Sequence, residues 1–203
     1  MTHKLLCIAF ATVGLAVHSN AQVVINELSA ANWSGQTDSF CEREDWIELY
    51  NTTGAVVDIS GWYLSDSQTN NTKYQIPPGT TIGANGRLMV WCSNRNTFAG
   101  GSPHPNFKLT QSQGDRAVLS DASANIVDNF LFSEPTQTDH SWGRTTDGAA
   151  TWSLFQTPTP NAANAGGGPY YATKPTMSVD AGYHAGAVNV ALSSPDAGAT
   201  IRY

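Results

Sequence analysis

Between residues 22 and 164 the chain consists of short apolar runs, and turn residues interrupt these runs roughly every ten positions. No run has the length and the 3.6-residue period of an amphipathic helix. Short strands at this spacing are typical of a β-sandwich or a barrel. The pattern therefore predicts an all-β domain. The charged fraction of only 13% also argues against coiled coils and helical bundles.

About eight strands are expected, which is what an immunoglobulin-like sandwich needs. They span residues 23–28, 45–50, 62–64, 73–76, 86–92, 116–119, 126–132 and 141–144. Because side chains alternate along a strand, Ile47 and Leu49 are expected on one face, and Trp46 and Glu48 on the other. The strongly apolar run 86–92 predicts a central strand.

The large side chains gather in the middle of the chain, since all six tryptophans lie between residues 33 and 152. A buried Trp adds a large apolar area to a core, so Trp62 and Trp91 are core candidates. The residues expected in the core and the sheets are Trp46, Ile47, Leu49, Trp62, Leu64, Leu88, Val90, Trp91, Val118 and Leu119. Residues 30–44 and 93–105 are expected to be long loops, where a binding function would lie.

Residues 1–21 have the pattern of a secretory signal peptide. Lys4 precedes the apolar run 5–17, and small residues follow it, so cleavage is expected between Ala21 and Gln22. The alternative is a membrane anchor, but the run is shorter than the roughly 20 residues that span a bilayer. We therefore expect an exported bacterial protein, secreted or at the cell surface, without a membrane span after cleavage.

Two cysteines remain after removal of the signal, Cys41 and Cys92. A pair of cysteines in a secreted domain predicts a disulfide. The alternative is two free buried thiols.

Seven segments of the chain together resemble the lamin tail domain as it occurs in secreted bacterial proteins. They are residues 24–28, 45–51, 58–66, 76–82, 106–109, 141–144 and 157–161. The resemblance covers about residues 22–165 and implies an immunoglobulin-like β-sandwich. It also implies an interaction or structural appendage of surface proteins, exported nucleases and kinase-like proteins, without an activity of its own.

The C-terminal part differs in composition. Residues 166–175 are rich in Gly and Pro and predict a linker. Alternating apolar and polar residues then predict strands at 176–179, 187–192 and 199–203. This part resembles the start of a chitobiase/β-hexosaminidase C-terminal-type β-sandwich. Three such strands cannot bury a core alone, so we expect residues 176–203 to be an incomplete second β-module of a longer protein.

Calcium is the metal for which the sequence offers candidates. Asp38, Glu42, Glu44 and Asp45 lie close together near Cys41, and calcium takes six to eight oxygen ligands. The spacing of a calcium-binding helix–loop–helix motif is absent, so a solvated acidic loop is expected instead. Glu27 and Glu48 lie among apolar strand residues. They are expected to face solvent or to cap backbone N–H groups of a bulge, and a shared cation or ligand site is the alternative.

Catalytic motifs are missing from the sequence. There is no nucleophile elbow, zinc-protease motif or phosphate-binding loop. His104, between two prolines, is expected in an exposed loop, His140 at a strand edge, and both in structural roles together with His184. We expect no enzyme activity and no cofactor in this chain.

The net charge of −6 argues against nucleic-acid binding. Exposed aromatics such as Trp33, Phe98, Tyr170 and Tyr171 could stack on sugars or contact a protein, although core or linker packing is the expected role. We therefore expect a non-catalytic extracellular interaction, adhesion or spacer module that contacts an unknown protein or a cell-surface glycan. The alternatives are a calcium- or carbohydrate-binding module, and the accessory region of a secreted enzyme (spore-coat kinase-like, nuclease or glycan-active) whose catalytic domain lies beyond residue 203.

Overall fold

The computed structural model describes residues 22–112 and 114–202, so the expected signal peptide 1–21, including Ala21, lies outside the described residues. This part of the chain is all β and has no helix. Its strands are β1 (Val23–Ser29), β2 (Asp45–Asn51), β3 (Val57–Asp58), β4 (Tyr63–Ser65), β5 (Tyr74–Gln75), β6 (Thr81–Ile82), β7 (Arg87–Cys92), β8 (Thr97–Ala99), β9 (Ser102–His104), β10 (Arg116–Ser120), β11 (Ile126–Leu131), β12 (Ser141–Arg144), β13 (Trp152–Phe155), β14 (Thr176–Met177) and β15 (Leu192–Ser193).

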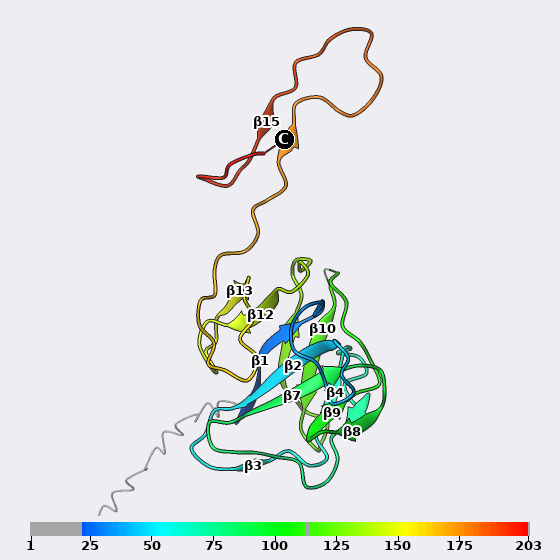
Figure 1. Ribbon diagram of the computed structural model, residues 1–203, viewed down its shortest axis with the longest axis vertical. Coiled ribbons are helices and arrows are strands. Elements are labelled where there is room, and N and C mark those ends of the chain that lie inside the picture. The colour runs from blue at the N-terminus through cyan, green and yellow to red at the C-terminus, as the bar shows by residue number, and fades with distance from the viewer. Residues whose placement is uncertain (1–21, 113, 203) are drawn as a thin grey trace, which may run out of the picture.

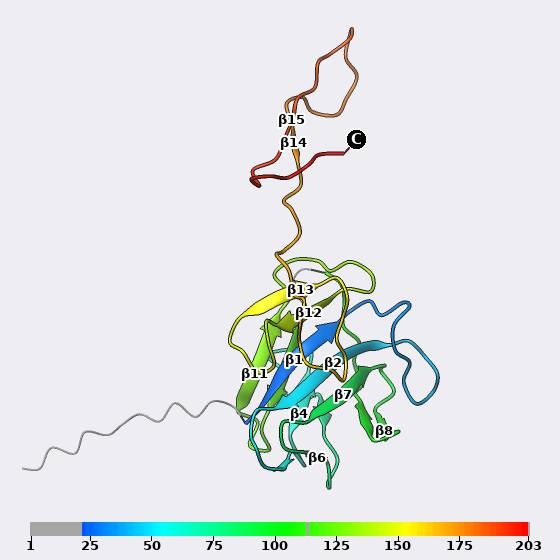
Figure 2. The same cartoon turned by 60° about the vertical axis from the view of Figure 1, so that its left-hand side comes forward.

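Two antiparallel sheets form the sandwich (Figures 1 and 2). The five-stranded sheet has the order β13-β12-β1-β2-β7, and the four-stranded sheet has the order β11-β10-β4-β5. The remaining described strands form the two-stranded pairs β3–β6, β8–β9 and β14–β15. The predicted immunoglobulin-like all-β class is confirmed.

The hydrophobic core lies between the two sheets. Ile47 and Leu49 belong to it, whereas Trp46 lies on the opposite face of β2 in a small cluster with Met89 and Trp91. The alternation predicted for β2 is therefore confirmed. Of the residues predicted for core and sheets, those that are buried are Trp46, Ile47, Leu49, Leu64, Val90, Trp91, Val118 and Leu119. Trp62 and Leu88 are only partly buried and pack against the core.

The prediction that run 86–92 is a central strand is wrong, because β7 is an edge strand that pairs with β2 alone. It is apolar because both of its faces are covered. Val90 and Cys92 face the main core, while Met89 and Trp91 pack beside Trp46 on the other face. A continuous apolar run therefore indicates that both faces of a strand are buried. It does not show that the strand has a hydrogen-bonded neighbour on each side.

A polar bridge connects the two sheets next to an irregularity in β1. The pairing of β1 with β2 shifts register between Ile25 and Glu27. The Ile25 N–H donates to Asp128 Oδ2 of β11 at 2.8 Å, and Arg144 Nε of β12 donates to the Ile25 carbonyl at 2.7 Å. Arg144 also pairs with Asp128 at 2.7 Å. Side chains therefore satisfy backbone groups of β1 that face the neighbouring sheet.

Residues 93–105 contain a hairpin, which corrects the predicted loop. Strands β8 and β9 pair around Gly100 and Gly101, both of which have a positive φ. The hairpin packs on the sandwich, where Tyr74 Oη donates to the Thr97 carbonyl at 2.8 Å. His104 is fully buried in β9, so its predicted exposure is wrong. His104 packs on β7 and on loop 30–44, and this packing buries it. The flanking prolines, from which exposure was predicted, do not report such packing.

The C-terminal residues form a much smaller structure. Strands β14 and β15 have two residues each and lie away from the sandwich in both views (Figures 1 and 2). Residues 199–202 form no strand, which contradicts the third predicted strand. Met177, Val188 and Val190 are exposed. Such short strands bury no core, and a two-stranded hairpin is at best marginally stable without one.

Candidate functional site

A pair of glutamates lies under a covering segment on the outer face of the five-stranded sheet. Glu27 of β1 and Glu48 of β2 are direct cross-strand partners, and neither is exposed. The expectation that they face solvent is therefore wrong. Two carboxylates opposite each other in a sheet repel, and burial adds a desolvation cost. The neighbouring donors offset part of that cost.

Those donors come largely from residues 157–164, called here the covering segment. Thr159 donates its N–H to Glu27 Oε1 at 2.9 Å and its hydroxyl to Glu27 Oε2 at 2.6 Å. The Asn161 N–H donates to Glu48 Oε2 at 2.6 Å. The two glutamates thus cap backbone N–H groups of the covering segment. This is close to one of the predicted roles, but the capped groups do not belong to a bulge.

Two buried asparagines complete this anchor. Asn26 Nδ2 lies 2.9 Å from Glu48 Oε1 and 3.1 Å from Asn164 Oδ1. Asn164 Nδ2 donates to the carbonyls of Asn26 at 3.1 Å and Arg144 at 2.7 Å. Side-chain amides therefore hold the covering segment against the sheet in place of a strand ladder.

The buried pair has altered acidity. Burial raises the pKa of Glu48 to about 7, and burial also raises the pKa of Glu27. Arg87 Nε lies 3.4 Å from Glu48, and Asp147 adds a further negative charge near Glu27. The described residues of this network include more carboxylates than cations, so its protonation is coupled to the stability of the fold.

Beside this anchor, the covering segment and loop 30–36 enclose a groove of about 530 Å³. Trp46, which is only 2% exposed, is one of the residues that line the groove. Two hydrogen bonds connect the walls: Gln36 Nε2 donates to the Pro160 carbonyl at 3.4 Å, and Asn161 Nδ2 donates to Gln36 Oε1 at 3.1 Å. The lining residues are Ser29, Asn32, Ser34, Gly35, Gln36, Trp46, Asp139, Gln156, Thr157, Pro158, Thr159, Pro160 and Ala162.

Trp33 lies between two residues that line the groove, and 79% of it is exposed. Its position in the loop is fixed by Asp139. Asp139 Oδ1 accepts the N–H groups of Trp33 at 2.7 Å and Ser34 at 2.8 Å, and Oδ2 accepts the Ser34 hydroxyl at 2.8 Å. These backbone hydrogen bonds lower the pKa of Asp139, so it is ionised at neutral pH. The chain thus holds a large exposed aromatic on a fixed backbone.

The four calcium candidates have separate partners. Asp38 Oδ1 accepts the N–H groups of Phe40 and Glu42, while Glu42 pairs with Arg95. Glu44 Oε2 lies 2.7 Å from Lys108 Nζ. Asp45 starts β2, and burial raises its pKa to about 6. Among the described residues, no group of three or more His, Cys, Asp or Glu side chains is placed to hold a metal ion.

The predicted disulfide is not formed. Cys41 is exposed at a turn with φ of 62°, whereas Cys92 is fully buried in β7 and faces the core. The two thiols lie in different environments and both are free. Burial raises the pKa of the Cys92 thiol, which leaves it unreactive.

Ser93, His104 and Asp38 meet under loop 30–44 without forming a catalytic triad. Ser93 Oγ lies 3.1 Å and Asp38 Oδ2 lies 3.8 Å from the same ring atom, His104 Nδ1. A triad places the nucleophile and the carboxylate on opposite ring nitrogens. Here Nε2 is buried without a hydrogen-bond partner, and burial lowers the pKa of His104. This arrangement fits a role in packing the loop and does not fit acyl transfer.

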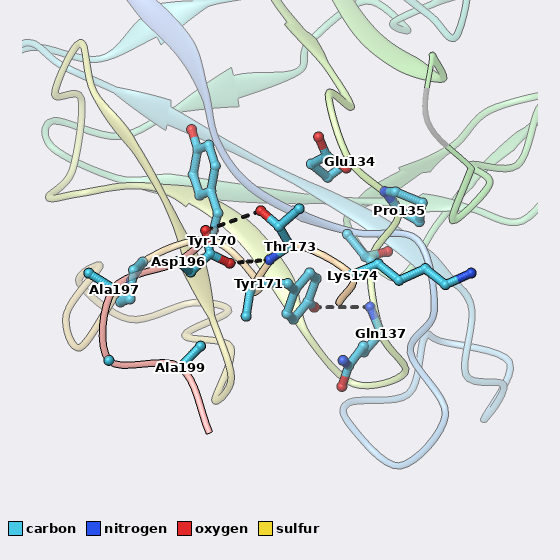
Figure 3. Close-up of a pocket in the computed structure, with 14 residues that line it drawn as sticks. Glu134, Pro135, Gln137, Tyr170, Tyr171, Thr173, Lys174, Asp196, Ala197 and Ala199 are labelled. Carbon is cyan, nitrogen blue, oxygen red and sulfur yellow. Dashed lines mark hydrogen bonds between the residues drawn. The ribbon is translucent and has the colours of Figure 1, made fainter. Parts of the chain in front are cut away.

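A second hollow, of about 990 Å³, lies where the C-terminal residues leave the sandwich (Figure 3). The Tyr171 hydroxyl accepts the Gln137 N–H at 3.0 Å, and Tyr170 packs edge-on to Trp142. The packing role expected for Tyr171 is thus confirmed, whereas Tyr170 remains 53% exposed. Among the described residues, the far wall is joined to the rest of the hollow by the hydrogen bonds between Thr173 and Asp196. The groove beside Trp33, with both walls bonded to the sandwich, is therefore the better candidate site.

The groove between loop 30–36 and the covering segment was not predicted as such, although loop 30–44 was expected to carry a binding function and Glu27 with Glu48 was an alternative ligand site. The residues that build the groove come from segments more than 100 positions apart, and none of them forms a motif. The Pro-rich segment 157–161 did give a sequence signal. It is one of the segments that resemble the lamin tail domain, so it was expected to belong to the sandwich and not to the linker.

Comparison with known families gives a match that covers more than half of the chain. A family model described as Lamin Tail Domain matches residues 16–133 of this chain. The match includes Glu27, Glu48 and Trp33 and ends before β12 and the covering segment. No curated protein matches the chain. In residues 22–112 and 114–202 there is no helix of the length and apolarity needed to cross a membrane.

Proposed function

The chain belongs to the lamin tail domain family, whose fold is a non-catalytic, immunoglobulin-like interaction domain, and we propose that this chain acts outside the cell as a non-catalytic docking module. The groove beside Trp33 is the proposed contact surface. Residues 1–21 support the extracellular location, because their sequence has the pattern of a secretory signal.

The exposure of Trp33 is the observation that carries the proposal. A tryptophan exposed over 79% of its surface contributes no core packing, and leaving its apolar area in water is unfavourable. Because Asp139 holds the backbone of Trp33 and Ser34, ordering this loop costs little entropy when a partner binds. Exposed tryptophans are enriched among residues that dominate binding energy.

The chemistry of the remaining clusters also supports a non-catalytic role. The Ser93–His104–Asp38 cluster is buried and has the wrong order for nucleophilic catalysis. The buried glutamates are occupied by hydrogen bonds from the covering segment. These clusters stabilise the loops that frame the groove.

Binding to a cell surface tests the proposal. The exported chain, with residues 22–203 intact, is incubated with bacterial cells and with purified cell walls, and the adsorbed fraction is measured. We expect adsorption that weakens at least about tenfold in Trp33→Ala, as for an aromatic hot spot. Phe98→Ala, which removes a half-exposed aromatic from β8, is the matched control and should adsorb normally. Equal adsorption of wild type and Trp33→Ala would remove the groove from the proposal.

A further inference from the structure

We propose that the groove beside Trp33 binds an uncharged saccharide, with a sugar ring stacked on the Trp33 indole. This inference rests on the proposed docking function and names the chemical class of its ligand.

The first argument is the charge of the groove. Asp139 is the one charged residue among those that line it, and both of its oxygens already accept hydrogen bonds from Trp33 and Ser34. No lysine or arginine is among the lining residues to bind a phosphate, sulfate or uronic acid, and Arg43 beside the groove donates its Nε to the Gly35 carbonyl at 3.3 Å. It also offers no unoccupied carboxylate for a basic peptide. An uncharged ligand is therefore the one with the smallest desolvation cost on entering the groove.

The second argument is the kind of polar group that remains. The Gln156 amide and the Thr157 hydroxyl are exposed, and their side chains make no hydrogen bond within the described part of the chain. Neutral amides and hydroxyls both donate and accept, which matches the hydroxyl groups of a sugar. An apolar surface with a few placed polar groups is typical of sites for small ligands.

The third argument is size and surface. The groove volume of about 530 Å³ lies within the range of small-ligand sites, roughly 300–1,000 Å³, and suits a few sugar rings more than a large protein interface. The Trp33 indole offers an apolar plane to the C–H face of a pyranose and keeps an N–H for a polar contact. Asp139 holds the backbone of Trp33 between Asn32 and Ser34, which both line the groove, although Trp33 itself is not a lining residue.

Titration with defined oligosaccharides tests the inference. Cellotetraose, chitotetraose and mannotetraose are the neutral probes, and tetragalacturonate is the charged comparator. Binding to the chain 22–203 is followed by calorimetry and by tryptophan fluorescence. We expect at least one neutral probe to bind with a dissociation constant below about 1 mM, and tetragalacturonate to bind at least about tenfold more weakly.

Variants locate the binding. Trp33→Ala should weaken binding of the neutral probe at least about tenfold, and Gln156→Ala by a smaller factor, while Phe98→Ala leaves it unchanged. Trp33 and Gln156 are exposed, so both variants should fold normally, which their circular dichroism and melting temperature will check. Unchanged binding in Trp33→Ala overturns the inference.

Two further outcomes separate this inference from the docking function itself. If no neutral saccharide binds at about 10 mM, but the chain adsorbs to cell surfaces through Trp33, the saccharide inference is wrong and the docking function stands. Adsorption that resists enzymatic removal of glycans and disappears after protease treatment of the cells also overturns the saccharide inference and identifies a protein partner. If the chain neither adsorbs nor binds a saccharide, both proposals are wrong.

Discussion

The sandwich and the C-terminal hairpin have the same alternation of apolar and polar residues, yet they fold to very different extents. In the sandwich, β1 and β2 have seven residues each and lie against a core that is fully buried. In the hairpin, β14 and β15 have two residues each, and Val188 and Val190 remain about half exposed. Alternation therefore specifies which face a strand buries, but a strand extends only where a second layer covers that face.

The largest expected effect comes from a comparison in which one apolar side chain is shortened in each region. Leu49 is fully buried in the sandwich, so Leu49→Ala should lower the free energy of unfolding by about 2–5 kcal/mol. Val190→Ala in the hairpin should change it by less than about 0.5 kcal/mol. Urea denaturation of both variants measures the difference. Similar losses would mean that the hairpin has a core of its own.

A smaller loss is expected where the covering segment is held by side chains. Asn164→Ala removes donors to the carbonyls of Asn26 and Arg144 and leaves buried polar groups unpaired. We expect a loss of about 2–3 kcal/mol, since an unsatisfied buried group costs about 1–3 kcal/mol. Denaturation followed by tryptophan fluorescence measures it. Gln156→Ala, in the same region but exposed, is the control and should be nearly neutral.

The buried acids of the sandwich give its stability a pH dependence. Because burial raises the pKa of Glu48 from 4.5 to about 7, the native state keeps a proton that the unfolded chain releases above about pH 4.5. Stability from this group therefore falls as pH rises from about 4.5 to about 7. Glu27 and Asp45 act in the same direction, since burial raises their pKa values too. His104 acts in the opposite direction, because burial lowers its pKa.

Comparison with Glu48→Gln isolates the contribution of this carboxyl. Between pH 5 and pH 8 the variant should gain about 2–3 kcal/mol of stability relative to wild type, given that one pKa unit is about 1.4 kcal/mol. Urea midpoints at both pH values measure this gain. Parallel profiles for the two proteins would show that Glu48 has an ordinary pKa.

The smallest effect is expected from removing the hairpin altogether. A chain that ends after Tyr171 keeps the contacts of Tyr170 with Trp142 and of Tyr171 with His140. Its free energy of unfolding should lie within about 0.5 kcal/mol of the longer chain, because the lost residues bury little apolar surface. Ending the chain after Gln156 instead removes the covering segment and should destabilise the sandwich. Calorimetry of both truncations compares the two boundaries.

Much of the sandwich could be predicted because its strands carry local signals. The alternation in β2 placed Ile47 and Leu49 on one face and Trp46 on the other, and the structure confirms both faces. The strands that were missed, such as β13 and the pair β8–β9, have three or four residues each, too few to show a period. Such short strands form where a neighbouring strand provides hydrogen-bond partners. The local sequence does not show where this happens.

The candidate site was less predictable. Core or linker packing was the expected role of Trp33, and its exposure of 79% shows that this prediction is wrong. Nothing near it in the sequence points to Asp139, which holds its backbone. The disulfide was inferred from the presence of two cysteines, and the structure places one thiol in the core and the other in solvent. Composition indicates which groups are present, whereas their distance depends on how the sheets stack.

The sequence by itself determined that the chain is all β and which face of β2 is buried, because these follow from short apolar runs between turns and from the two-residue period of side chains along a strand. Its lamin tail type followed from the resemblance of its segments to that family. Only the tertiary structure decided that Glu27 and Glu48 are buried partners under residues 157–164, and that a groove opens beside Trp33. The reason is physical: hydrogen bonds between segments more than 100 residues apart depend on the register and stacking of whole sheets, which no local pattern encodes.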